Sequence, residues 1–144
     1  MRTIFVDANI LIYLFEDRSE LAELAARLLR RIEQRGDALC TSTLVAAEVR
    51  TGARLMGDES LEFAYRALFA SPEWRLLPFA VSTVDHFVRA RLLPGVKAPD
   101  AIHLACAAEH EVDVFLTHDS RLAGQFVPGI GFIVDLHTDI FGGG

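Results

Sequence analysis

The sequence contains few of the features that mark several large classes of protein. Its two cysteines, Cys40 and Cys106, lie in separate apolar segments and match no metal-ligand spacing, so we expect buried, reduced thiols rather than a disulfide framework or a zinc site. No apolar run reaches the roughly 18 residues of a membrane-spanning helix, and no secretory leader precedes the strand-like run at Thr3. We therefore expect a cytoplasmic protein with no membrane partner.

The sequence also lacks residues that three classes of phosphate-handling protein need. The only lysine, Lys97, precedes a predicted helix, whereas a receiver-type signalling domain needs a lysine near the end of a late strand. An aspartyl-phosphate phosphotransferase needs a second aspartate two residues after Asp7, where the sequence has Asn9. No glycine-rich phosphate loop follows a predicted strand, so a nucleotide-binding module is not indicated.

What the chain does contain is the composition of one ordinary globular domain. It has 144 residues, of which 51% are hydrophobic and 24% charged, and this length accommodates one core. We therefore interpret residues 1–144 as a single domain without an internal repeat or linker. Residues 137–144 carry no hydrophobic pattern and end in three glycines, so we expect a mobile tail there.

The charge balance is acidic, and the bases are unevenly placed. Twenty acids against 14 bases give a net charge of −6, an unfavourable sign for contact with RNA unless bound divalent cations neutralise some carboxylates. Four arginines nevertheless share one short stretch: Arg27, Arg30, Arg31 and Arg35. Arginine can hold a phosphate through two parallel hydrogen bonds, but the same spacing also describes a solvated helix face.

Alternating short apolar runs and amphipathic segments predict an α/β fold. β-branched and aromatic runs predict strands at residues 3–6, 38–40, 74–79, 114–117 and 131–134. Apolar positions at helical spacing predict helices at residues 8–15, 19–34, 42–56, 60–69, 82–93 and 98–110, with a short one at 120–125. Strands that alternate with helices form parallel βαβ units. The expected architecture is a three-layer α/β/α sandwich around a parallel sheet of about five strands.

Two aspartates stand just past the ends of predicted strands. Asp7 follows the run at residues 3–6, and Asp119 follows the run at residues 114–117. Ligands of open parallel sheets bind at the carboxyl ends of the strands, where the strand order reverses. If these two strands are neighbours, the two carboxylates approach each other at that edge. The alternative for either residue alone is a helix N-cap, for which aspartate is well suited.

Two further acids lie in the first halves of predicted helices. Glu48 shares a helix face with Leu44, where an unpaired carboxylate would be costly to bury. The alternative is a surface glutamate, or one paired with Arg50 or Arg54. Asp100 opens a nearly uncharged helix, where a first-turn aspartate also stabilises the helix dipole. Each acid therefore has a structural explanation beside a functional one.

The combination of the four acids indicates a metal site. Asp7, Glu48, Asp100 and Asp119 would repel one another at one sheet edge unless a cation lay between them. Their hard oxygen ligands suit Mg²⁺ or Mn²⁺ better than zinc. Such a cation could activate a water and stabilise the leaving oxygen of a phosphodiester. We therefore expect hydrolytic phosphodiester cleavage.

Several polar residues lie close to these acids in the sequence. Asn9 and Thr117 could orient a ligand, a water or a carboxylate, although capping and strand-end packing explain them equally well. Ser42 is better explained as a helix cap than as a phosphate contact. His103 and His118 can titrate near neutrality, and we interpret both as supporting or surface residues.

Four segments resemble, in order, the motifs of PIN-domain nucleases. They are VDANILI at residues 6–12, STLVAAE at 42–48, PDAIHLA at 99–105 and LTHD at 116–119. Each motif alone is moderately specific, but the four together cover the chain from residue 3 to 134. The fourth motif often reads Thr-Asn-Asp, and His118 replaces the asparagine here. This departure bears on pH dependence or metal preference rather than on the class.

The resemblance implies a three-layer fold and Mg²⁺- or Mn²⁺-dependent RNA cleavage. The implied metal ligands are Asp7, Glu48, Asp100 and Asp119, with Asn9 and Thr117 as supporting polar residues. Single-domain members of this length are similar to VapC-type toxins of bacterial toxin–antitoxin pairs. Those toxins are usually homodimers, inhibited by an antitoxin whose C-terminal segment reaches the site, where a basic side chain can replace the metal's charge.

Two other functions are compatible with the same resemblance. One is a housekeeping nuclease that processes RNA, and the other is an inactive PIN domain that acts only through protein partners. The presence of all four acids argues against the inactive domain. The sequence does not distinguish transfer, ribosomal and messenger RNA as the substrate.

Overall fold

The strands form one parallel sheet with β1 at its centre. The computed structural model describes residues 1–141, and within them the strands are β1 (Thr3–Val6), β2 (Ala38–Ser42), β3 (Trp74–Leu77), β4 (Val114–Leu116) and β5 (Phe132–Val134). The sheet has five strands in the order β3-β2-β1-β4-β5, and every neighbouring pair is parallel. The chain thus extends the sheet on one side of β1 and then returns to extend it on the other.

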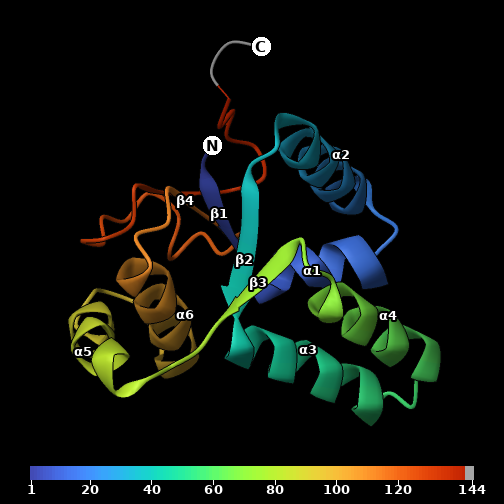
Figure 1. Ribbon diagram of the computed structural model, residues 1–144, viewed down its shortest axis with the longest axis horizontal. Coiled ribbons are helices and arrows are strands. Elements are labelled where there is room, and N and C mark those ends of the chain that lie inside the picture. The colour runs from blue at the N-terminus through green and yellow to red at the C-terminus, as the bar shows by residue number, and fades with distance from the viewer. Residues whose placement is uncertain (142–144) are drawn as a thin grey trace.

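Helices cover both faces of this sheet. They are α1 (Ala8–Glu16), α2 (Glu20–Arg35), α3 (Thr43–Leu55), α4 (Glu59–Ala70), the 3-10 helix η1 (Val81–Thr83), α5 (Val84–Arg91) and α6 (Ala98–Glu109). Figure 1 shows α5 and α6 on one side of the sheet, α1, α2 and α4 on the other, and α3 below the strand ends. The predicted three-layer α/β/α fold is therefore confirmed. No helix within residues 1–141 is long and apolar enough to cross a membrane.

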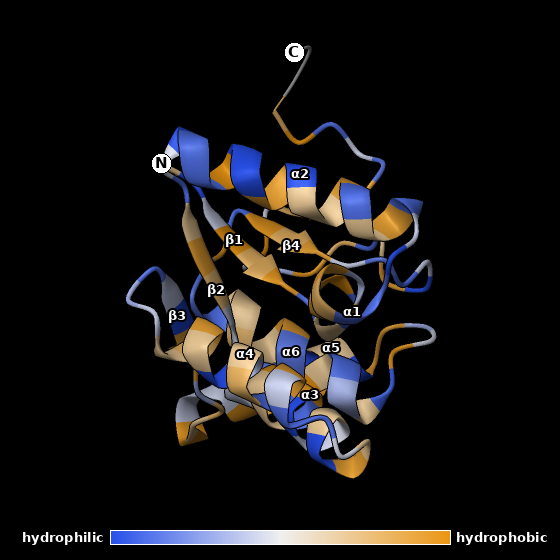
Figure 2. Cartoon of the chain, turned by 90° about the vertical axis from the view of Figure 1, so that its right-hand side faces the viewer, coloured by the Kyte–Doolittle hydropathy of each residue, from blue (hydrophilic) through white to orange (hydrophobic). Residues whose placement is uncertain are grey.

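The core lies between the sheet and the two helix layers. Ile4, Phe5 and Val6 of β1 are fully buried, and the Phe5 ring stacks on Phe115 of β4 with 4.7 Å between the ring centroids. Figure 2 shows β1, β2 and β4 as an apolar layer and α2 with its polar residues on the outer side. Central parallel strands are buried on both faces, which is why they carry continuous apolar runs.

Three predicted segments differ from the structure. The predicted helix at residues 120–125 is wrong, because residues 120–124 form turns and no helix is present there. Gly124 adopts a left-handed φ of 82° and donates its backbone N–H to the Ile133 carbonyl at 3.0 Å, which takes the chain off a helical path. The predicted helix at residues 82–93 is shorter and is preceded by η1. The strand predicted at residues 74–79 ends at Leu77, where Pro78 cannot continue the ladder.

The last described residues pack against the domain, and the mobile tail expected from residue 137 stays a prediction. Ile140 is 8% exposed, and its carbonyl accepts a hydrogen bond from the Arg2 guanidinium. The Phe141 ring centroid lies 4.8 Å from the Arg31 guanidinium and 4.6 Å from that of Arg35. Two of the four clustered arginines of α2 therefore stack on an aromatic ring. Residues 142–144 of the expected tail lie outside the described residues.

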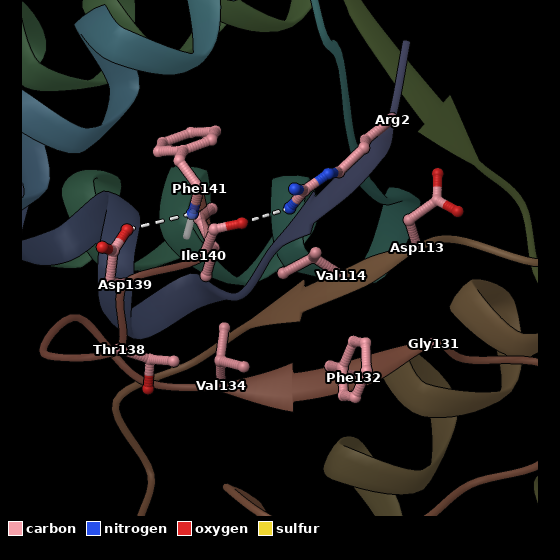
Figure 3. A pocket seen from close by; sticks show the side chains of 10 residues that line it. All are labelled: Arg2, Asp113, Val114, Gly131, Phe132, Val134, Thr138, Asp139, Ile140 and Phe141. Atoms are coloured by element: carbon pink, nitrogen blue, oxygen red, sulfur yellow. Dashed lines mark hydrogen bonds between the residues drawn. The ribbon is translucent and has the colours of Figure 1, made fainter. Parts of the chain in front are cut away.

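A cavity of about 610 Å³ lies between this C-terminal segment and strands β4 and β5 (Figure 3). Arg2, Phe132 and Ile140 are among the residues that line it. Of the residues that the structure describes, none of the predicted site residues belongs to this lining. The cavity is therefore separate from the sheet edge at which the carboxylates were expected.

Candidate active site at the carboxyl ends of β1 and β4

The carboxyl ends of β1 and β4 meet where the strand order reverses. The two strands pair in parallel, with Val6 opposite Leu116, while β2 and β3 continue the sheet from the other side of β1. Asp7 follows Val6 directly, and Asp119 lies in the loop after β4. The first and fourth strands are neighbours, which meets the condition under which the two carboxylates would approach each other, and both aspartates lie at the switch point of the sheet.

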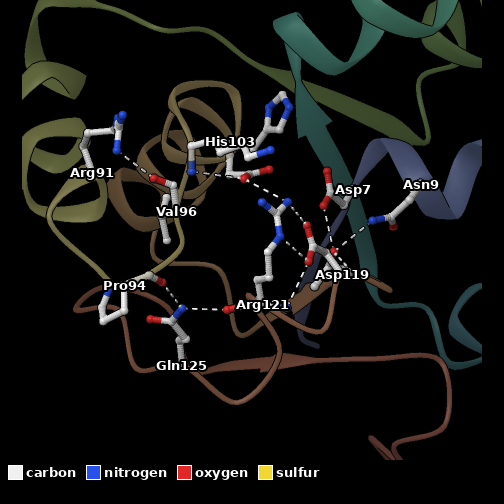
Figure 4. Close-up of polar contacts among 12 residues, drawn as sticks. Asp7, Asn9, Arg91, Pro94, Val96, His103, Asp119, Arg121 and Gln125 are labelled. Carbon is white, nitrogen blue, oxygen red and sulfur yellow. Dashed lines mark hydrogen bonds and ion pairs between the residues drawn. The ribbon is translucent and has the colours of Figure 1, made fainter.

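A single hydroxyl group connects three of the predicted site residues. Thr117 is fully buried, and its Oγ1 donates a hydrogen bond to Asp7 Oδ2 at 2.8 Å. The same oxygen accepts hydrogen bonds from Asn9 Nδ2 at 3.2 Å and from the Asp119 backbone N–H at 3.1 Å. Asn9 Oδ1 in turn accepts the backbone N–H of His118 at 3.1 Å. Figure 4 shows Asp7, Asn9 and Asp119 gathered at this point.

Asp7 is a buried carboxylate that also caps a helix. It is 5% exposed, and its Oδ1 accepts the backbone N–H of Ala8 at 2.8 Å at the start of α1. Burial raises the pKa of Asp7, and Asp100 adds to the rise, while His103 and the hydrogen bond from Thr117 oppose it. The capping interpretation is confirmed, and the same carboxylate carries an electrostatic cost that a nearby cation would relieve.

Asp100 and Asp119 are joined by one arginine. Asp100 lies in the first turn of α6, where its Oδ2 accepts the Lys97 backbone N–H at 3.3 Å. Arg121 Nη2 lies 3.5 Å from Asp100 Oδ2 and also contacts Asp119 Oδ2, while Arg121 Nε donates to Asp119 Oδ1 at 3.0 Å (Figure 4). The hydrogen bond from Arg121 holds the pKa of Asp119 below its ordinary value. Arg121 was not among the predicted site residues; its only signal is its place two residues after Asp119.

Glu48 is connected to α6 through a buried histidine. The Glu48 side chain on α3 is 38% exposed, and its Oε2 lies 3.7 Å from His103 Nε2. His103 is buried, and its Nδ1 lies 2.8 Å from the Oγ of Ser42, the predicted cap of α3. Glu48 is exposed rather than buried on the apolar helix face, as the surface-glutamate alternative had it, and Arg50 pairs with Glu62 at 2.9 Å. His103 therefore supports Glu48 from inside the domain.

The four carboxylates share one region of the molecule, but they do not converge. Across residues 1–141, no group of three or more histidine, cysteine, aspartate or glutamate side chains lies close enough together to hold a metal ion. Asp100 and Asp119 are engaged by Arg121 instead. A cation held jointly by the predicted ligands would therefore require side chains to move.

His118, at the position where the fourth motif departs from the family pattern, belongs to an aromatic cluster. Its ring centroid lies 5.5 Å from that of Tyr13 and 5.7 Å from that of His137. The backbone N–H of His118, rather than its ring, makes the contact with Asn9. The interpretation of His118 as a supporting residue therefore applies to its backbone.

A parallel α/β sheet with carboxylates at its switch point defines a class of domain that binds ligands at that edge. A family model described as PIN domain matches residues 4–124. The chain therefore belongs to the PIN domain family, and the predicted family is confirmed. A search of curated proteins finds no match.

Three solved structures have a similar fold. VapBC2 from Rickettsia felis, bound to a promoter DNA fragment, matches with a TM-score of 0.72 at 13% identity, over 92% of this chain and 98% of that one. A toxin–antitoxin complex from Klebsiella pneumoniae gives a TM-score of 0.63 at 27% identity, over 88% and 94%. VapC20 from Mycobacterium tuberculosis, a toxin that cleaves the sarcin–ricin loop, gives 0.68 at 18%, over 81% and 90%.

Proposed function

We propose that this PIN domain is a Mg²⁺- or Mn²⁺-dependent endoribonuclease and the toxin of a cytoplasmic VapBC-type toxin–antitoxin pair. The observation that carries the proposal is the placement of Asp7, Asp100 and Asp119 at one sheet edge, linked through Thr117 and Arg121. The resemblance to PIN-domain nucleases assigns RNA cleavage to these three acids together with Glu48. VapC20, which cleaves an RNA loop, supports RNA as the substrate class.

The predicted ligands fit a hard divalent cation. Asp7, Glu48, Asp100 and Asp119 offer only oxygen atoms, which Mg²⁺ and Mn²⁺ prefer. Burial disfavours the ionised form of Asp7, and a cation beside it would restore that form. When bound, the metal would supply an activated water and positive charge for the phosphodiester.

Residues around these acids would hold them in place for the reaction. The Thr117 hydroxyl fixes one oxygen of Asp7 and the backbone of Asp119 at the same time. His103 lies 3.7 Å from Glu48 Oε2 on the buried side, where it would restrict the orientation of that side chain. Supporting contacts of this kind typically change metal affinity or activity by about 10–100-fold. Their role is to position the acids rather than to touch the RNA.

We further propose an antitoxin partner and a homodimer. Two of the similar structures contain toxin–antitoxin pairs, and an acidic sheet edge attracts a basic antitoxin side chain that replaces the metal's charge. For the homodimer, the support is an exposed apolar stripe along η1 and α5. It consists of Val81, Val84, Val88 and Leu92. Stripes of this kind mark protein interfaces, and light scattering of the purified protein measures whether a dimer forms.

Cleavage of a total RNA pool tests the enzymatic proposal. Purified protein, freed of any co-purifying partner, is incubated with the RNA with and without Mg²⁺ or Mn²⁺, alongside the Asp7→Asn variant. Cleavage that needs the metal and is lost in the variant supports the proposal, and the fragment ends then identify the target RNA. Equal cleavage by the variant indicates a contaminating nuclease and overturns the assignment of the site.

One observation favours an inactive PIN domain that acts through protein partners. The acids do not converge among the residues that the structure describes. In that case neither metal supports cleavage of any RNA, and the Asp7→Asn variant binds the partner as the natural protein does. A housekeeping nuclease would cleave RNA in the same assay, but its gene would have no small antitoxin gene directly upstream.

A further inference from the structure

One guanidinium group joins two acids that come from different parts of the fold. Asp100 lies in the first turn of α6, and Asp119 lies in the loop after β4. Arg121 Nη2 contacts Asp119 Oδ2 and lies 3.5 Å from Asp100 Oδ2. Arg121 Nε adds a hydrogen bond to Asp119 Oδ1 at 3.0 Å. The positive charge thus lies between two of the proposed metal ligands.

The backbone of Arg121 is fixed, whereas its side chain is not enclosed. Its N–H donates to Asp119 Oδ1 at 2.9 Å, and its carbonyl accepts from Gln125 Nε2 at 2.6 Å. The same Gln125 nitrogen donates to the Pro94 carbonyl at 3.0 Å, which ties this loop to the segment before α6 (Figure 4). The Arg121 side chain is 42% exposed, so the guanidinium can leave the two acids without disturbing the backbone.

Arg121 and a divalent cation need the same oxygen atoms. Both oxygens of Asp119 accept hydrogen bonds from the guanidinium, and Oδ1 accepts the Arg121 backbone N–H as well. Asp100 Oδ2 faces the same Nη2. Carboxylate lone pairs that accept these hydrogen bonds are not available to coordinate a metal. Two positive charges between the same acids would also repel each other.

The geometry points to Arg121 as an internal competitor of the divalent cation: its single positive charge offsets part of the negative charge of Asp100 and Asp119, and the side chain must swing into solvent for the metal to bind. This inference rests on the proposed function, because it takes the four acids as the metal site. Its consequence is a metal affinity lower than the acids alone would give. The domain then binds metal only where the cation concentration is high enough to displace its own arginine.

Mn²⁺ binding, measured by isothermal titration calorimetry at low ionic strength and without RNA, tests the inference. Arg121→Gln removes the charge and nearly keeps the size of the side chain. We expect it to bind Mn²⁺ about tenfold more tightly than the natural protein, the scale of losing one competing charge-assisted hydrogen bond. Arg121→Lys keeps the charge but loses the paired N–H donors of the planar guanidinium, and we expect its Mn²⁺ affinity to be intermediate.

Arg66→Gln is the matched control, because it removes the same charge from an exposed position on α4. It should leave Mn²⁺ affinity within about twofold of the natural value. Equal or weaker binding by Arg121→Gln than by this control would overturn the inference. If Mn²⁺ still binds the natural protein and not Asp7→Asn, the proposed metal site survives that result. Absence of binding to both the natural protein and Arg121→Gln would overturn the site and the inference together.

Discussion

The two halves of the site are built by different means. Around Thr117, buried hydrogen bonds link Asp7, Asn9 and the backbone of Asp119, and the pairing of β1 with β4 sets their geometry. Around Arg121, partly exposed charged side chains meet one another. The fold therefore fixes the first half, while charge balance holds the second. Mutations in the buried half should therefore lower activity and stability. Mutations in the exposed half should instead change metal affinity and the dependence of stability on salt and pH.

Replacement of Asp7 should give the largest loss of activity. Asp7→Asn keeps the size of the side chain but removes the charge from the buried half of the site. We expect RNA cleavage to fall on the order of a hundredfold or more, the scale of losing one preorganised electrostatic group. Initial rates over a range of Mn²⁺ concentrations measure the loss. A decrease that extra Mn²⁺ fully restores would mean that Asp7 contributes affinity only.

The same substitution should change how stability depends on pH. Burial raises the pKa of Asp7 above its ordinary value of 3.8, so its charge penalises the folded state above the raised pKa and costs nothing below 3.8. The difference in unfolding free energy should therefore shift in favour of Asp7→Asn as the pH rises from about 4 to about 7. Urea unfolding at both pH values measures the shift. Parallel pH profiles would show that Asp7 is not a penalised charge.

Loss of the Thr117 hydroxyl should affect activity and stability together. Thr117→Val keeps the shape but removes one donor and one acceptor that serve Asp7, Asn9 and Asp119. We expect cleavage to fall by about 10–100-fold and unfolding free energy by about 1–3 kcal/mol, because buried polar groups lose their partner. Thr117→Ser is the control and should retain most of both. Full stability in the valine variant would contradict the buried network.

The buried half of the site could largely be predicted from the sequence. Asp7 and Thr117 stand at the ends of apolar runs, and strand ends in a parallel sheet meet at one edge. The helical spacing of apolar residues also predicted most of the helices that cover the sheet, because burial of one helix face requires apolar residues at that spacing. The order of the strands was not predicted, and the proximity of Asp7 and Asp119 was expected only if the first and fourth strands were neighbours. That order depends on contacts between β1 and β4 that no local pattern encodes.

The contacts of Arg121 with Asp100 and of His103 with Ser42 and Glu48 could not be predicted, because they join residues that are far apart in the chain. Arg121 reaches Asp100 only once the loop after β4 lies beside α6. His103 contacts Ser42 and Glu48 only when α6 packs near α3. The short helix expected at residues 120–125 does not form. The backbone N–H of Gly124 donates a hydrogen bond to Ile133 of β5 instead, and this contact outweighs the local helical spacing.

Removal of His103 should cause a smaller loss of activity, transmitted through Glu48. His103→Phe keeps a buried ring but removes the contacts to Ser42 and Glu48. We expect cleavage to fall about tenfold. If His103 acts by positioning Glu48, the double variant with Glu48→Gln should be no less active than Glu48→Gln alone. Losses that multiply in the double variant would assign His103 an effect of its own.

The smallest expected effect is on stability, and it concerns the exposed half. Because Arg121 lowers the pKa of Asp119, their pair stabilises the fold above the ordinary pKa of 3.8, and this contribution is lost as the pH falls through the lowered value. Arg121→Gln should therefore slightly lower the thermal unfolding midpoint at about pH 7, and the decrease should shrink as the pH falls below 3.8 or as salt is raised to about 0.5 M. A large decrease in the unfolding midpoint that salt does not reduce would mean that Arg121 is held as firmly as Thr117 in the buried half. A metal could then not readily displace the guanidinium.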